Sequence, residues 1–181
     1  RVDEELRKLV EDNKRKNEEV KKELKKLKEE NERVNKEVRE RDRKLHEKLR
    51  RVLEEVRRTI REDELREIEE TLKRLNDRNE ELHRRNEEES KRAEDKVRTE
   101  LEKNRKISEE IKKKAEDRKD GDEEEMRRLL EEYEELVRRV LKRLKEILEE
   151  YERLVRRVEE EVKKSLEDIE RKIKEAKDRV D

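Results

Sequence analysis

The chain has 181 residues, of which 65% are charged, and its 58 basic side chains balance 59 acidic ones. A net charge of −1 gives no field that would hold a nucleic acid or an anionic membrane, and no run of more than two uncharged residues is available to span a bilayer. The absence of cysteine excludes disulfides and zinc–thiolate sites, and leaves the cellular compartment undetermined.

The first stretch of the chain has the periodicity of a straight helix. From Val2 to Val20, Val38 and Val56, the apolar stripe takes five steps in every 18 residues, or 3.6 residues per step. A strict heptad would impose a left-handed supercoil, so this pitch predicts a nearly untwisted helix over about residues 2–61. Because hydrophobic residues are only 26% of the chain, this periodicity is what favours a folded protein over a disordered one.

A slip in the phase of the stripe between Ile60 and Leu65 predicts the first turn. Asp63 is the expected N-cap of the second helix, which we place at about residues 64–118.

The single glycine predicts a second turn at Asp120-Gly121-Asp122, because glycine accepts positive φ and aspartate caps a helix. A third helix follows over about residues 122–180. The chain has no proline and is rich in Glu, Lys, Arg and Leu, which favours helix throughout. We predict an all-α, up-down-up three-helix bundle forming one rod-like domain over residues 1–181.

Polar residues interrupt the apolar stripes at mirrored positions. Folding the chain about its two turns places Asn17 level with Ser108 and Tyr133, and Asn35 level with Ser90 and Tyr151. The predicted polar clusters are Asn13, Asn17, Asn104, Ser108 and Tyr133, and then Asn31, Asn35, Asn86, Ser90 and Tyr151. Closed hydrogen-bond networks of these groups would penalise any other register of the helices. The alternative is that some asparagines lie at the edge of a stripe and face water.

The two histidines define a third polar layer. His46 falls level with Asn79, and His83 with Asp42. A metal site would use both histidines and Asp42, but no ligand-spacing motif supports one, so we predict none. We expect a satisfied network, with the alternative of a pH switch that destabilises the fold below about pH 6.

The third helix carries a second apolar row beside its main stripe. A helix that touches two neighbours needs a wide stripe, so we expect this row to pack on the first helix. The alternative is an interface with another helix or another copy of the chain. The row comprises Leu129, Leu136, Ile147 and Leu154.

Two near-identical segments show how regular the chain is. Glu-Glu-Tyr-Glu-Glu-Leu-Val-Arg-Arg-Val at 131–140 recurs as Glu-Glu-Tyr-Glu-Arg-Leu-Val-Arg-Arg-Val at 149–158. With the charged surface and spaced polar layers, the whole chain resembles computationally designed helical bundles with buried hydrogen-bond networks. The resemblance implies a scaffold, an assembly component or a switch, and transfers no site residues. Its helices are longer than is usual for a compact unit, and its first turn lacks glycine or proline.

No motif in the chain carries catalytic chemistry. It has no glycine-rich phosphate loop and no Ser-His-Asp order, and its carboxylates alternate with Lys and Arg on solvent faces. We therefore predict no enzyme activity, no cofactor and no required partner. The leading function is a structural scaffold. The runner-up is a component that assembles with itself or with a helical partner, and a single charged helix acting as a spacer is the third alternative.

Overall fold

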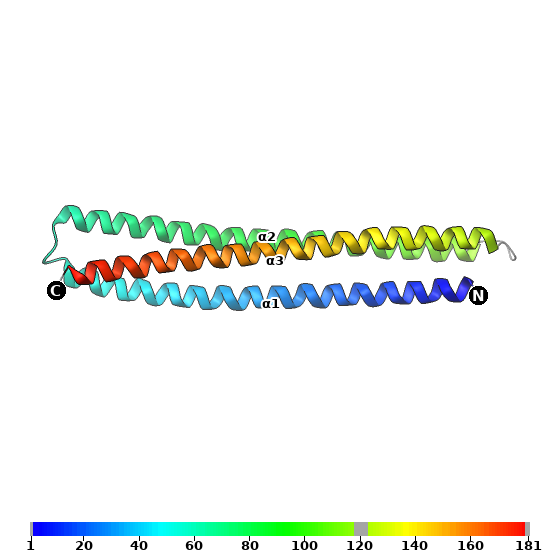
Figure 1. Cartoon of the computed structure of the whole chain (residues 1–181), viewed down its shortest axis with the longest axis horizontal. Helices are drawn as coiled ribbons and strands as arrows, with labels where there is room; N and C mark the ends of the chain where they lie inside the picture. Colours follow the sequence, from blue (N-terminus) through cyan, green and yellow to red (C-terminus); the bar gives the residue numbers. More distant parts are fainter. Residues whose placement is uncertain (1, 118–122, 180–181) are drawn as a thin grey trace. The chain divides into compact units, whose positions relative to one another are not determined.

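The computed structural model of the protein describes residues 2–117 and 123–179, and is all-α (Figure 1). Three long helices pack against each other as a bundle: α1 (Val2–Val56), α2 (Glu62–Asp117) and α3 (Glu123–Asp178). The fold class agrees with the prediction. The predicted turn at Asp120-Gly121-Asp122 lies outside the described residues. Within the described ranges, no helix has a stretch long and apolar enough to cross a membrane.

Acidic side chains fill the first turn of every helix. Glu62, Asp63 and Glu64 open α2, and three glutamates, Glu123 to Glu125, open α3. These carboxylates lie where the first backbone N–H groups have no helical partner and the helix dipole is positive. Each helix is therefore stabilised at its start by charge.

The first turn lies earlier in the chain than the sequence predicted. Helix α1 ends at Val56, whose carbonyl accepts hydrogen bonds from the backbone N–H groups of Thr59 and Ile60, both at 3.0 Å, and from the Thr59 hydroxyl at 3.2 Å. Ile60 packs against the apolar core, which draws the turn inward. The prediction that this helix continues to residue 61 is therefore wrong. Asp63 is also not the N-cap, because α2 already begins at Glu62.

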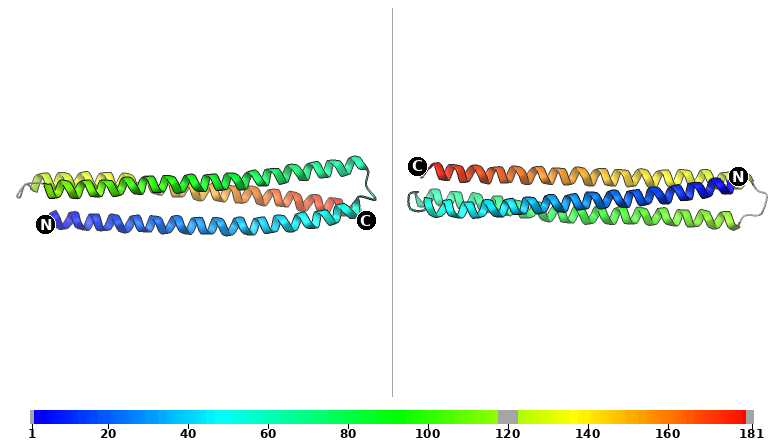
Figure 2. Two further views of the ribbon diagram at one scale, coloured as in Figure 1. Left: turned by 180° about the vertical axis from the view of Figure 1, so that it is seen from behind. Right: turned by 90° about the horizontal axis from the view of Figure 1, so that it is seen from below.

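The helices divide into two compact units, each built from a segment of all three. Unit 1 comprises residues 1–28 and 90–152, and unit 2 comprises residues 29–89 and 153–181. In each unit α2 runs antiparallel to α1 and α3, as the ribbons in Figure 1 and Figure 2 show. The predicted single rod-like domain stays a prediction.

Unit 1 holds two clusters of buried apolar side chains. The first contains Leu6, Val10, Ile111, Met126, Leu129 and Tyr133. The second contains Val97, Val140, Leu144, Ile147 and Leu148, with Val20, Leu24 and Leu27 of α1 packed against it but only partly buried. On α1, this part of unit 1 therefore leaves its apolar residues incompletely covered.

Unit 2 holds one larger apolar core. Its central α3 side chains, Leu166 and Ile169, are fully buried. The core extends over α1 and α2 through Val38, Leu45, Leu49, Val52, Val56, Ile68, Leu72 and Leu82.

Candidate functional site

The first polar layer, in unit 1, is built around a reciprocal pair of buried amides. Asn13 Nδ2 donates to Asn104 Oδ1 and Asn104 Nδ2 donates to Asn13 Oδ1, both at 2.8 Å. Asn104 Nδ2 also donates to Asn17 Oδ1 at 2.7 Å. Asn13 and Asn104 are 2% and 0% exposed, so the pair is dry, whereas Asn17 is only partly buried.

Two hydroxyl groups complete the hydrogen bonds of this layer, one from Ser108 of α2 and one from Tyr133 of α3. Asn13 Nδ2 lies 3.1 Å from Ser108 Oγ and 3.0 Å from the Tyr133 hydroxyl, and these two oxygens are 2.9 Å apart. The two hydrogens of Asn13 Nδ2 are therefore shared among three acceptors. The pairing of Ser108 with Tyr133 agrees with the prediction. Burial raises the pKa of the Tyr133 phenol, and its hydrogen bonds with Ser108 and Asn13 partly oppose that rise.

Unit 2 contains the same amide arrangement. Asn31 Nδ2 donates to Asn86 Oδ1 at 2.8 Å, and Asn86 Nδ2 donates to Asn31 Oδ1 at 3.0 Å and to Asn35 Oδ1 at 3.1 Å. Asn31 and Asn86 are buried, and Asn35 is partly buried. An asparagine doublet on α1 with one facing asparagine on α2 is thus a repeated element, once in each unit.

The second predicted hydroxyl pair lies in unit 1. The Tyr151 hydroxyl donates to Ser90 Oγ at 3.1 Å, as the sequence predicted. Tyr151 is 3% exposed and Ser90 is partly buried.

The predicted level of α1 against α2 is wrong by about one helical turn. Asn17 was expected to meet Ser108, but its bond is with Asn104, and Ser108 bonds Asn13. The cause is the position of the first turn: α1 ends at Val56, so every residue of α1 meets a residue of α2 that comes earlier in the chain than predicted. The level of α2 against α3 is correct.

The third polar layer, in unit 2, is not a closed network. His46 Nδ1 lies 2.8 Å from the backbone oxygen of Asp42 and 3.3 Å from its Oδ1, on the same helix. The predicted pairings of His46 with Asn79 and of His83 with Asp42 are not found. The side-chain polar atoms of Asn79 and His83 are buried and have no hydrogen-bond partner within the described chain. These residues line one pocket of about 450 Å³ between α1 and α2.

The environment of His83 disfavours its charged form. Burial lowers its pKa, the nearby Arg39 lowers it further, and Asp42 and Glu87 oppose this effect. Across residues 2–117 and 123–179, no three His, Asp or Glu side chains gather as a set that would hold a metal ion.

The second apolar row of α3 mostly faces the core. Leu129 and Ile147 are 8% and 4% exposed and belong to the apolar clusters of unit 1. Leu154 is partly buried against the core of unit 2, and Leu136 is partly buried. This burial favours the packing role of the row over the interface role.

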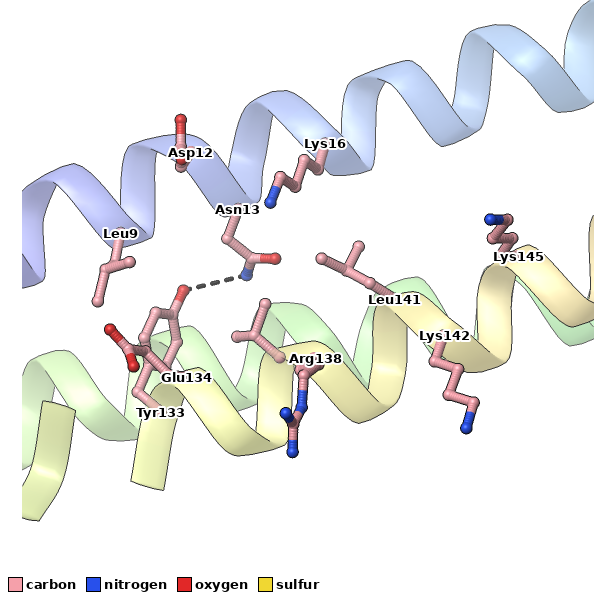
Figure 3. Close-up of a pocket in the computed structure, with 11 residues that line it drawn as sticks. Leu9, Asp12, Asn13, Lys16, Tyr133, Glu134, Arg138, Leu141, Lys142 and Lys145 are labelled. Atoms are coloured by element: carbon pink, nitrogen blue, oxygen red, sulfur yellow. Dashed lines mark hydrogen bonds between the residues drawn. The ribbon is translucent and has the colours of Figure 1, made fainter. Parts of the chain in front are cut away.

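A groove between α1 and α3 in unit 1 leaves apolar side chains partly accessible, and the sequence did not reveal it. Its volume is about 530 Å³, and its apolar lining comes from Leu9, Val137 and Leu141. All three are only partly buried. Figure 3 shows Leu9 and Asn13 of α1 projecting toward Tyr133 and Leu141 of α3.

Comparisons of the chain with protein-family models, with curated proteins and with solved structures found no match.

Proposed function

We propose that the protein is a non-catalytic structural scaffold whose polar layers fix the register of its helices. The observation that carries the proposal is the reciprocal bond between Asn13 and Asn104, at 2.8 Å in both directions, which recurs between Asn31 and Asn86. All four amides are buried, so their donors and acceptors are satisfied by each other and by neighbouring side chains and not by bulk water.

The energetics support a role in register more than in stability. A satisfied buried hydrogen bond contributes roughly 0.5–1.5 kcal/mol net, whereas an unsatisfied buried polar group costs roughly 1–3 kcal/mol. A shift of α1 along α2 by one helical turn separates the paired amides. The same shift costs an apolar stripe little, because another leucine or valine then occupies each position. The polar layer therefore selects one alignment among several that bury similar apolar surface.

A distance measurement between α1 and α2 tests this role. Because the chain has no cysteine, Lys14→Cys and Glu110→Cys give two exposed sites in unit 1 for spin labels. Pulsed electron paramagnetic resonance should show one narrow distance. Replacing the first layer by Asn13→Leu, Asn104→Leu, Ser108→Ala and Tyr133→Phe should keep the helical circular dichroism but add distances that correspond to slips of about 5.4 Å per turn.

The matched control is Asn17→Leu, which removes the partly exposed member of the layer and leaves the Asn13–Asn104 pair. This variant should keep the single distance. If the variant that lacks the Asn13, Asn104, Ser108 and Tyr133 polar groups also keeps one unshifted narrow distance, these groups do not set the register in unit 1 and the proposal fails.

We also propose that the chain is a designed protein. The near repeat of 131–140 at 149–158 and the recurrence of the same amide arrangement after 18 residues support this origin. A scaffold of this kind needs no cofactor.

A further inference from the structure

The groove between α1 and α3 in unit 1 has the dimensions of a helix-binding surface. Its lining runs from Leu9 to Lys16 on α1 and from Tyr133 to Lys145 on α3. On α3 this is about 18 Å at ~1.5 Å per residue, or a little over three helical turns. A helix placed between two helices buries apolar side chains at every third or fourth position, so a groove of this length accepts three or four of them.

The apolar lining of the groove has no cover from the chain's own helices. Leu9 and Val137 pack on the first apolar cluster of unit 1 and Leu141 on the second, yet all three keep part of their surface accessible. Neighbouring apolar positions of each stripe, such as Leu6 and Val140, are buried. The exposure therefore lies on one side of unit 1, along the α1–α3 seam.

The charges around the groove are not balanced, although the whole chain is nearly neutral. Its lining includes four basic and two acidic side chains. Three of the four basic side chains, Lys16, Lys142 and Lys145, are exposed. Lys16 and Lys145 lie on the two sides of the groove in Figure 3.

We propose that this groove is a docking site for one amphipathic helix of a partner protein, with Asp or Glu residues beside its apolar stripe. The apolar side chains of the partner would cover Leu9, Val137 and Leu141. Its carboxylates would pair with Lys16, Lys142 and Lys145, which give the lining its excess of positive charge. Asp12 and Glu134 lie toward the other end of the lining on α1 and α3, so the acidic flank of the partner belongs over Lys142 and Lys145.

Two synthetic peptides test the docking site. Each has four heptads with leucine at two positions per heptad and alanine on the outer face, and carries a fluorescent label. One peptide has glutamate beside the leucine stripe and the other has lysine. Fluorescence anisotropy with the full chain at low salt should show saturable binding of the glutamate peptide at least tenfold tighter than that of the lysine peptide.

A charge reversal at the groove locates the binding. Lys16→Glu, Lys142→Glu and Lys145→Glu together should weaken binding of the glutamate peptide at least tenfold and strengthen binding of the lysine peptide. The matched control reverses three exposed lysines on α2 in unit 1, Lys91→Glu, Lys96→Glu and Lys112→Glu, and should change either affinity less than twofold. Circular dichroism of both variants checks that the fold is kept.

Three outcomes would overturn the proposal. One is no saturable binding of the glutamate peptide, and another is equal affinity of the parent chain for both peptides. The third comes from light scattering of the full chain alone: a dimer that the groove reversal dissolves and the α2 reversal does not would show that a second copy occupies the groove. This test is independent of the scaffold proposal, because the groove variants leave the polar layers unchanged.

Discussion

Asn104→Leu is the sharpest test of the buried amide pair. Asn104 is fully buried and makes three hydrogen bonds, two with Asn13 and one with Asn17. Leucine has a similar volume but no polar atom, so the substitution leaves Asn13 Oδ1 buried with no donor. Asn17 is only partly buried, so its amide can turn to water.

The expected loss of stability comes from the side-chain oxygens of Asn13 and Asn17, which both lose their hydrogen bond with Asn104. The stranded Asn13 oxygen costs roughly 1–3 kcal/mol and the lost bond to Asn17 about 1 kcal/mol, while the added apolar surface of leucine offsets part of this. We expect Asn104→Leu to lower the free energy of unfolding by about 2 kcal/mol. Adding Asn13→Leu removes the stranded oxygen, so the double variant should recover at least about 1 kcal/mol of that loss.

Denaturant unfolding followed by circular dichroism gives the free energies for this cycle. Asn17→Leu is the comparison variant: it keeps the Asn13–Asn104 pair but leaves one hydrogen of the buried Asn104 Nδ2 without an acceptor, so it should cost roughly 1–3 kcal/mol. If Asn104→Leu changes the free energy by less than about 0.5 kcal/mol, or if the double variant loses the sum of its two single losses, the pair is not the satisfied, dry unit described above.

Three further predictions concern single buried groups. Ser165 is 2% exposed and its hydroxyl has no partner in the described chain, so Ser165→Ala should raise the free energy of unfolding by roughly 1 kcal/mol, and a loss in denaturant unfolding would contradict this. The pKa of His83 is lowered in the fold, so the unfolded chain binds more protons than the folded chain as the pH falls through about 6.5, and the fold loses stability. The midpoint of thermal unfolding should therefore drop more between pH 7.5 and 5.5 for the parent chain than for His83→Gln. Equal drops for the two chains would refute this prediction. Burial raises the pKa of Tyr133, and a Tyr151→Phe variant leaves Tyr133 as the only tyrosine, so its titration can be followed by phenolate absorbance. The titration midpoint of the folded variant should lie above the midpoint near 10 of the denatured chain. A lower midpoint in the folded variant would contradict the burial.

The pairing of α2 with α3 was predictable because one residue marks the second turn. The prediction took Gly121 as the point of reversal, which placed Ser108 level with Tyr133 and Ser90 level with Tyr151, and the hydrogen bonds of both pairs agree with it. The first turn carries no such mark. Its position depends on how Thr59 and Ile60 bond and pack around Val56, which is a tertiary effect that local propensity does not contain.

The third polar layer and the groove show a different limit of the sequence. The stripe correctly indicates which residues face inward, and Asn79 and His83 are indeed buried. Whether their polar atoms reach the predicted partners depends on how α1 is aligned with α2. The predicted alignment of these two helices was wrong by about one helical turn. The groove depends on how far α1 and α3 lie apart beside Leu9 and Val137, and no periodicity in either helix encodes that separation.

The asparagine doublet on α1 discriminates between slips in opposite directions. If α1 moves so that Asn17 takes the place of Asn13, an amide still faces Asn104, but Lys21 arrives where Asn17 was, and an ammonium group cannot accept the bond that Asn104 Nδ2 now donates at 2.7 Å. If α1 moves the other way, Leu9 replaces Asn13 and Asn13 takes the place of Asn17, so Asn104 Nδ2 keeps one acceptor but Asn104 Oδ1 has no donor. The second slip loses two bonds and the first loses one, so the residual disorder in register after weakening the layer should be one-sided. In Asn13→Leu, which keeps Asn17 and Asn104, the spin-label distances between residues 14 and 110 should therefore gain a component on one side of the parent value only.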